Sequence, residues 1–289
     1  MQLTMFEEEN KIGATKKLPL KNVVTTKKID LVRPFLRYPG SKFNASKHIQ
    51  PFWEAISFEE YREPFLGSGA IFFKMPKARY SWLNDFDKEL INSFRVVASP
   101  KKRKELIELV GAVVPTPEYF EKLKYESPKT VLEKAFRYFV INRTAYSGIM
   151  KQPNWGFHAT KSVQPSKWPE RILQAGLKLE ADVLITSNHF REVITTPSKN
   201  KVWMFVDPPY FLADQKRAYL HSFGLQEHLE LENLLKNTSH QFCLTYDNCQ
   251  EVKDLYKWAN VHEVDWMYHT ANSNVTTRKV GKELIITNY

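Results

Sequence analysis

Apolar residues along this chain fall into short runs of strand length, separated by stretches with helical spacing. Runs of four to eight apolar or alternating residues that end at turn-forming residues are typical of half-buried or buried strands. The strand-like runs cover residues 80–85, 181–187, 202–206, 241–246, 261–268 and 282–289. Helical spacing occurs at 43–55, 88–97 and 226–236. Strands that alternate with helices predict an α/β sheet.

The sheet pattern stops between residues 100 and 178. Leu106–Val110, Tyr119–Leu123 and Val131–Tyr146 have helical apolar spacing there. We therefore expect a mostly helical insertion at 100–178, inside a domain formed by 33–99 and 179–289. Residues 1–32 are lysine-rich and show no sustained period, so we expect a flexible basic tail. A minor role of this tail in phosphate contact is the alternative.

The net charge of the chain bears on the class of partner that it binds. Its 289 residues include 42 Lys and Arg against 32 Asp and Glu, which leaves a formal net charge of +10. Such an excess favours a polyanionic partner, although charge alone does not separate nucleic acid from a membrane surface or from simple solubility. No run of about 18 apolar residues predicts a membrane-spanning helix.

The N-terminus and the cysteines indicate the compartment. The first residues lack the basic-then-apolar order of a signal peptide. Cys243 and Cys249 are too few for a disulfide framework and fit a reduced cytosol.

The strand-like run Val202–Val206 ends in Asp207-Pro208-Pro209-Tyr210. Neither proline can donate to a sheet ladder, so the strand must stop there. In open α/β sheets, ligands bind at the carboxyl ends of strands. The pattern predicts a binding site where an acid and an aromatic ring are held side by side. A strand-ending turn with an ordinary buried tyrosine is the alternative.

Two glycine-containing turns precede this element. Pro39-Gly40-Ser41-Lys42 predicts a tight turn that opens a helix, where backbone N–H groups and Lys42 could hold an anion. Glu63–Ala70 contains a Gly-x-Gly pattern, which lets the backbone approach a nucleoside closely at a strand-to-helix corner. Each pattern alone is unspecific, and an ordinary turn explains the first equally well.

Asp85 ends the next strand-like run after these glycines. In nucleoside-binding α/β folds, a carboxylate at this place accepts hydrogen bonds from ribose hydroxyls. The alternative is an N-cap for the helix at 88–97, a role that Asp87 could also fill.

Aromatic, basic and turn-forming residues are interleaved from 142 to 161, without a regular period. This composition suits a loop or hairpin that reaches nucleic acid, and a plain structural loop is the alternative. The candidate DNA contacts in this stretch are Arg143, Tyr146, Lys151 and Lys161.

The order of these motifs resembles that of the Dam-like (D12 class) DNA adenine-N6 methyltransferases. The resemblance covers about 33–289 and includes Asn142–Gly148, Tyr219–His228 and Glu283–Asn288. It implies a Rossmann-like, seven-stranded methyltransferase sheet with an inserted, mostly helical target-recognition domain. It also implies S-adenosylmethionine as the cofactor, with S-adenosylhomocysteine as the product, and double-stranded DNA as the partner.

The resemblance further implies a role for each motif. Tyr38, Gly40 and Lys42 would hold the methionine end of the cofactor. The floor beneath the cofactor would be formed by Phe65, Gly67 and Gly69. Asp85 would accept hydrogen bonds from the ribose hydroxyls.

The acceptor side follows from the same resemblance. Asp207 and the Pro208 carbonyl would accept the two N–H bonds of adenine N6, and Tyr210 would stack on the flipped ring. Asp207 would also border the cofactor. Aspartate at the first position is typical of adenine methylation, whereas cytosine-N4 enzymes usually carry serine. A cytosine-N4 or RNA adenine-N6 methyltransferase, and a catalytically silent DNA-binding protein, are the alternatives.

Two departures from the family pattern stand out. His189 occupies a position where many relatives have aspartate, and Trp155–Thr160 does not match the recognition hairpin of GATC readers. The recognition sequence is therefore not inferred. None of the eight histidines has metal-ligand spacing with Cys or acids, so no metal site is expected. A cytoplasmic enzyme of a bacterium, archaeon or phage, with a cognate restriction endonuclease as a further partner, would fit this family.

Overall fold

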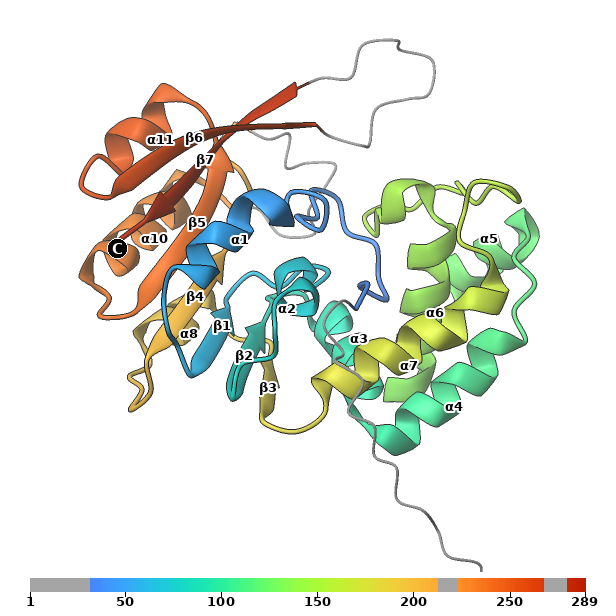
Figure 1. Ribbon diagram of the computed structural model, residues 1–289. Coiled ribbons are helices and arrows are strands. Elements are labelled where there is room, and N and C mark those ends of the chain that lie inside the picture. Colours follow the sequence, from blue (N-terminus) through green and yellow to red (C-terminus); the bar gives the residue numbers. More distant parts are fainter. Residues whose placement is uncertain (1–31, 213–222, 268–279) are drawn as a thin grey trace, which may run out of the picture.

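The computed structural model describes residues 32–212, 223–267 and 280–289. Its described strands form one seven-stranded sheet, which lies on the left in Figure 1. In chain order the strands are β1 (Glu60–Glu63), β2 (Tyr80–Asn84), β3 (Val183–Thr186), β4 (Val202–Val206), β5 (Gln241–Asp247), β6 (Asn260–Met267) and β7 (Val280–Thr287). The expected α/β class and seven-stranded sheet are thus confirmed.

The strand order places two of the predicted motifs next to each other. The order is β3-β2-β1-β4-β5-β7-β6, with β7 antiparallel to both of its neighbours and the other pairs parallel. Strands β2 and β3 lie on one side of β1, and β4 pairs with β1 on its other side, so the direction of strand addition reverses at β1. Ligands bind at the carboxyl ends of strands at such a reversal. The Gly-x-Gly turn after β1 and Asp207 after β4 meet there.

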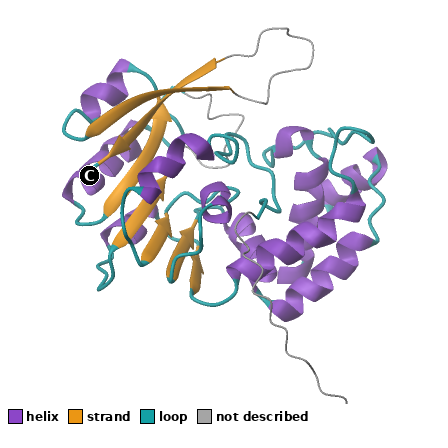
Figure 2. Cartoon of the chain, in the orientation of Figure 1, coloured by secondary structure: helices purple, strands orange, loops and turns teal. Residues whose placement is uncertain are grey.

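Helices cover the sheet and also form a lobe beside it (Figure 2). In chain order they are α1 (Ser46–Glu54), α2 (Ala70–Lys74), α3 (Lys88–Ala98), α4 (Pro100–Gly111), α5 (Pro117–Tyr125), α6 (Val131–Thr144), the 3-10 turns η1 (Tyr146–Gly148) and η2 (Pro165–Lys167), α7 (Trp168–Leu179), α8 (Phe190–Thr195), α10 (Leu225–Asn237) and α11 (Gln250–Leu255). Helices α4 to α7, which we call the helical insertion, lie on the right in Figure 1.

The central strand β4 explains why its sequence is apolar throughout. Trp203 and Phe205 pack into one hydrophobic core, while Val202, Met204 and Val206 pack into a second. Successive side chains of a strand point to opposite faces, so both faces of the sheet are covered. The first core takes in residues of α1, α2 and α3, and the second takes in residues of α8, α10 and α11.

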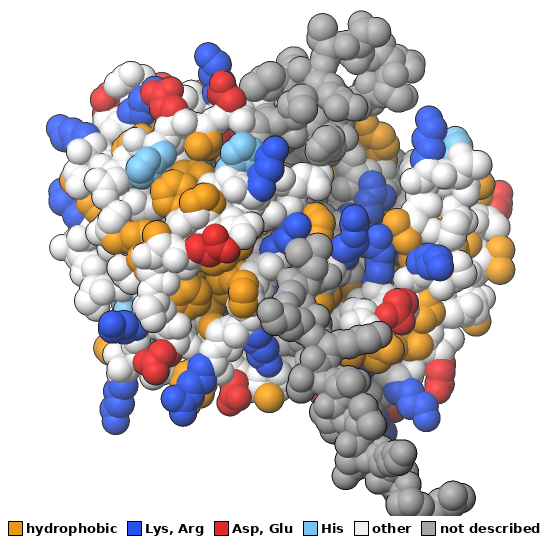
Figure 3. All heavy atoms as spheres, viewed as in Figure 1, with side chains coloured by type: hydrophobic (Ala, Val, Ile, Leu, Met, Phe, Trp, Pro, Cys, Tyr) orange, Lys and Arg blue, Asp and Glu red, His pale blue; other side chains and the backbone are white. Residues whose placement is uncertain are grey.

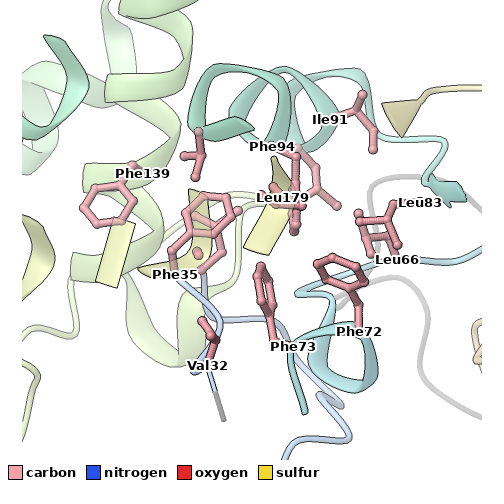
Figure 4. Close-up of a cluster of buried hydrophobic side chains, with 14 of the residues drawn as sticks. Val32, Phe35, Leu66, Phe72, Phe73, Leu83, Ile91, Phe94, Phe139 and Leu179 are labelled. Atoms are coloured by element: carbon pink, nitrogen blue, oxygen red, sulfur yellow. The ribbon is translucent and has the colours of Figure 1, made fainter. Parts of the chain in front are cut away.

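The first core continues into the helical insertion. Phe139 of α6 and Leu179 of α7 lie in the same cluster as Phe35 and Phe94, as Figure 4 shows. The rings of Phe35 and Phe94 are 4.9 Å apart between centroids and meet edge to face. Because apolar interiors are closely packed, this shared core holds the insertion in a defined position relative to the sheet.

Several sequence expectations can be compared directly with the structure. The strand-like runs at 202–206, 80–85 and 241–246 correspond to β4, β2 and β5. The run at 261–268 is strand β6 up to Met267, and Tyr268 lies outside the described residues, as do 1–31 of the expected tail. Val32 belongs to the folded part, because it is 3% exposed and packs in the first core. None of the helices formed by the described residues is long and apolar enough to cross a membrane.

Candidate active site

A cavity of about 260 Å³ opens at the carboxyl ends of β1 and β4; we call it the switch-point cavity. It is bordered by residues from segments that are far apart in the sequence. The predicted site residues among its lining are Tyr38, Gly40, Lys42, Phe65, Gly67, Asp85 and Asp207, together with Lys151. The fold thus brings most of the expected cofactor residues to one place.

Gly67 and Asp85 form the floor of the switch-point cavity. Gly67 has a φ of +49°, and a Cβ there would lie 3.0 Å from the ring of Tyr38, so the turn requires glycine. Asp85 Oδ2 accepts a hydrogen bond from the Gly67 amide at 2.9 Å, and Oδ1 accepts from the Asp87 amide at 3.0 Å. Burial raises the pKa of Asp85 to about 6.

Asp85 is not the N-cap of α3. Asp87 fills that role, because its Oδ1 accepts from the amides of Glu89 and Leu90. Gly69 does not border the cavity; with a φ of +66° it is the N-cap residue of α2. The carboxylate of Asp85 is therefore positioned by backbone amides and borders the cavity.

Aromatic rings form one wall of the switch-point cavity. Phe65 packs against Phe190 with ring centroids 5.2 Å apart, and His189 packs against Phe190 at 4.3 Å. Phe86 is 53% exposed and meets His189 edge to face at 6.3 Å. His189 caps α8, since its Nδ1 accepts from the Arg191 amide at 3.3 Å. This wall suits a planar ligand.

No sequence motif indicated a role for Phe86 or Phe190. The only signal for Phe86 was its place directly after Asp85. Phe190 follows His189, the residue that departs from the family pattern. Both rings reach the cavity because they follow the carboxyl ends of β2 and β3.

Asp207 lies at the end of β4 and is held by two side chains. Lys42 Nζ donates to both carboxylate oxygens, at 2.8 and 3.0 Å, and Thr245 Oγ1 donates to Oδ1 at 2.7 Å. Lys42 is 5% exposed. Its ammonium is therefore paired with Asp207, a contact that no sequence motif indicated.

Tyr210 is fixed from two directions. Its hydroxyl donates to Glu283 Oε2, and Glu283 is only 1% exposed on β7. Burial, together with the nearby carboxylates of Asp207 and Glu283, raises the pKa of Tyr210 well above its usual range. The Lys42 ammonium lies 4.7 Å from the centroid of the Tyr210 ring. Glu283 belongs to a stretch that matched the family, but no role was assigned to it.

Acidic side chains outnumber lysines in the lining of the switch-point cavity. Glu63 ends β1 and is 2% exposed; its Oε2 accepts from the Tyr61 hydroxyl at 2.7 Å, and burial raises its pKa well above the usual range. The acids that line the cavity are Glu63, Asp85, Asp87, Asp207 and Glu227. The lysines that line it are Lys42 and Lys151. Burial favours the neutral form of Glu63, and the other four acids still outnumber the two lysines, so the lining favours a ligand that carries positive charge.

A second, larger cavity of about 960 Å³ lies between the sheet and the helical insertion; we call it the basic cleft. Figure 3 shows Lys and Arg side chains gathered along this boundary. Besides Lys42, its cationic lining consists of Arg33, Arg37, Lys47, Arg143, Lys161 and Arg171. Asp265 is the one acid among its described lining residues. Such a surface attracts a polyanion.

The four candidate DNA contacts have different surroundings. Tyr146 is 52% exposed at the basic cleft, and Lys161 also borders it. Lys151 borders the switch-point cavity instead. Arg143 lies in the last turn of α6 and is 5% exposed, and its Nε has no hydrogen-bond acceptor among the described residues.

The electrostatic setting of Arg143 is unfavourable in the protein alone. Burial and the neighbouring cations Arg171 and Arg37 lower its pKa to about 9. Among the described residues no acid forms an ion pair with Arg143; a buried cation of this kind is costly, and an anion in the cleft would relieve that cost.

The described residues contain no group of three or more His, Cys, Asp and Glu side chains that could hold a metal ion.

The fold and the two cavities describe a class of protein: an α/β protein with a cavity at the switch point of its sheet and an adjoining basic cleft that shares Tyr38, Gly40, Ser41 and Lys42 with it. Comparison with known sequences identifies the family to which this chain belongs. The profile of the D12 class N6 adenine-specific DNA methyltransferases matches residues 38–270. The chain belongs to this family, as the motif order predicted.

Individual relatives are similar over most of their length. The chain is 24% identical to the Type II methyltransferase M1.LlaDCHI of Lactococcus lactis subsp. cremoris, over 93% of this chain and 99% of that protein. It is 23% identical to the Type II methyltransferase M.CviBI of Paramecium bursaria Chlorella virus NC1A, over 78% and 86%. It is also 23% identical to the DNA adenine methylase of Haemophilus influenzae, over 88% and 92%.

Proposed function

We propose that the switch-point cavity binds S-adenosylmethionine and that Asp207, the Pro208 carbonyl and Tyr210 receive an adenine turned out of duplex DNA in the basic cleft. Membership of the family establishes the adenine-N6 DNA methyltransferase class and implies dependence on S-adenosylmethionine. The assignment of residues is the proposal. It rests on the surroundings of each side chain.

The lining of the switch-point cavity fits this cofactor. Asp85 offers a carboxylate to the ribose hydroxyls, and the aromatic wall around Phe65 and Phe86 suits a purine. Lys42 offers a cation to the carboxylate at the methionine end. The excess of acids in the lining favours a sulfonium cation. When bound, the cofactor supplies an electrophilic methyl group on a good leaving group.

The acceptor residues can orient the nucleophile. The lone pair of adenine N6 is delocalised into the ring, which makes this nitrogen a poor nucleophile. Two hydrogen-bond acceptors, the carboxylate of Asp207 and the carbonyl of Pro208, favour a pyramidal nitrogen with a directed lone pair. Thr245 keeps the Asp207 carboxylate in a defined orientation. Positioning of this kind contributes more here than a strong base would.

The target base must leave the duplex to reach Asp207. Unpairing and unstacking cost a few kcal/mol. Stacking on Tyr210, whose ring is fixed through Glu283, offsets about 1–3 kcal/mol of this cost. Arg143, Lys161 and the other cations of the basic cleft would neutralise the phosphates that flank the extruded base.

One observation carries the proposal: Asp207 and Asp85 border the same cavity, and Lys42 borders both that cavity and the basic cleft. The test is to incubate a pool of duplexes of varied sequence with labelled S-adenosylmethionine, digest the DNA and identify the labelled nucleoside. N6-methyladenine is expected. Labelled N4-methylcytosine would support the cytosine-N4 alternative, and the absence of any methylated base would overturn the proposal.

The relatives named Type II methyltransferases suggest the biological setting. We propose that this chain is the modification half of a restriction system, acting in the cytoplasm on sites that a cognate endonuclease would cut. Methylated plasmid should then resist an endonuclease that cuts the unmodified plasmid at the same sites.

A further inference from the structure

Lys42 occupies the place that the proposed function assigns to the target base. Its ammonium donates to both oxygens of Asp207 and to the carbonyl of Gly40, the last at 3.1 Å. It also lies over the ring of Tyr210. One buried cation thus covers both the acceptor carboxylate and the stacking surface.

The ammonium and the adenine amino group have the same requirements. An ammonium has three N–H donors, and N6 has two. Both would donate to Asp207, and both would lie against the face of Tyr210. They cannot do so together, so the base can enter only after Lys42 leaves.

The position of Lys42 indicates where its ammonium can go. Its side chain lines both the switch-point cavity and the basic cleft. Withdrawal from Asp207 without a new partner would leave a buried charge uncompensated, which is strongly unfavourable. A carboxylate in the switch-point cavity would supply that partner. Thr245 would keep Asp207 oriented afterwards, with Oδ2 open to N6.

We propose that Lys42 is a coupling residue, which occupies the base site until the cofactor's carboxylate draws it away, so that cofactor and target base bind cooperatively. This inference rests on the proposed function. The inference explains why the cofactor would bind before the base. When the cofactor is bound, Lys42 has left Asp207 and the base can bind there; without the cofactor, the base must displace Lys42 from its buried ion pair with Asp207.

The test measures DNA affinity rather than turnover. A fluorescent duplex that carries one methylation site, located by sequencing methylated DNA, is titrated with the protein and its anisotropy is followed. The titration is repeated with saturating S-adenosylhomocysteine and with the decarboxylated form of that molecule. For the unmodified protein we expect S-adenosylhomocysteine to tighten binding about tenfold. The decarboxylated form should have at most a small effect.

Two variants distinguish the coupling between cofactor and DNA from the general loss of DNA affinity that follows the removal of a lysine. In Lys42→Met the base site is no longer occupied by an ammonium, so S-adenosylhomocysteine should change DNA affinity by less than about twofold. In Lys47→Met, which removes a lysine from the basic cleft, affinity should fall by the same factor with and without S-adenosylhomocysteine, and coupling should persist. A duplex without the methylation site should show no coupling.

The outcomes that overturn the inference are specific. If S-adenosylhomocysteine and its decarboxylated form tightened DNA binding by the unmodified protein equally, the inference would be overturned. This result does not depend on whether Lys42→Met folds. The inference would also be overturned if S-adenosylhomocysteine still tightened DNA binding by a folded Lys42→Met variant. The same holds if it had no effect on DNA binding by an unmodified protein that forms N6-methyladenine. Failure of the proposed function itself would be recognised separately, because no N6-methyladenine would form.

Discussion

The pKa of Asp85 leads to a quantitative prediction about cofactor binding. Burial raises this pKa to about 6 in the protein without ligand. An ionised carboxylate accepts hydrogen bonds from both ribose hydroxyls, so the ligand should select the ionised form. As the pH falls through about 6, Asp85 becomes protonated and affinity should be lost. A carboxyl with the ordinary pKa of 3.8 would remain ionised until a much lower pH.

The size of the effect follows from the same value. Each pH unit below the pKa reduces the ionised fraction about tenfold, which corresponds to about 1.4 kcal/mol. At pH 5 we expect the dissociation constant of S-adenosylhomocysteine to be roughly ten times its value at pH 7.5. Binding at pH 5 should release about one proton, and binding at pH 8 almost none.

Isothermal titration calorimetry without DNA, in buffers of different ionisation enthalpy, measures both quantities. Asp85→Asn keeps the size of the side chain and one acceptor but removes the titrating group. It should bind more weakly at pH 7.5, with an affinity that changes little from pH 5 to 8. The reasoning would be refuted by an unmodified protein without this pH dependence, or by an Asp85→Asn variant that retains it.

Three further predictions concern the turn, the cleft and the buried arginine. Gly67→Ala should weaken S-adenosylhomocysteine binding at least about tenfold, because a positive φ and the Tyr38 ring both oppose a Cβ there; binding within twofold of the unmodified protein would contradict this. Lys161→Ala should reduce the slope of log affinity for DNA against log salt by about 0.9, whereas Lys151→Ala should leave that slope unchanged and weaken cofactor binding. Arg143→Met should raise the free energy of unfolding by about 1 kcal/mol, because it removes a buried charge whose Nε has no acceptor among the described residues, and it should weaken DNA binding about tenfold. Denaturant unfolding and anisotropy measure the two effects, and a destabilised variant with unchanged DNA affinity would contradict the prediction.

The sequence allowed the site to be located but not its internal contacts. The family resemblance implied that Gly67, Asp85 and Asp207 belong to one site, and the structure brings them to one cavity because each follows the carboxyl end of a parallel strand. The pairing of Lys42 with Asp207 joins residues 165 positions apart. It depends on how far one side chain reaches across a finished fold, which no local pattern encodes.

The candidate DNA contacts show the same limit. Interleaved basic and aromatic residues suggested a loop, but α6 continues through Thr144 and buries Arg143 in its last turn. Lys151 follows the same stretch and reaches the switch-point cavity instead of the basic cleft. Composition identified the region that approaches the two cavities. The direction of each side chain depends on contacts between segments, such as the close approach of Gly156 to the backbone of Tyr146, which the composition of the stretch does not reveal.

The central claim is that Asp207 receives the N6 amino group at the carboxyl end of β4. Its most direct test is the single-turnover rate of methyl transfer by Asp207→Ala, beside Asp254→Ala as a control that removes an exposed carboxylate from α11. The account predicts that Asp207→Ala lowers the transfer rate at least about a hundredfold while S-adenosylhomocysteine binds as well as before or better, and that Asp254→Ala changes neither. Transfer by Asp207→Ala at a rate close to that of the unmodified protein would contradict the claim.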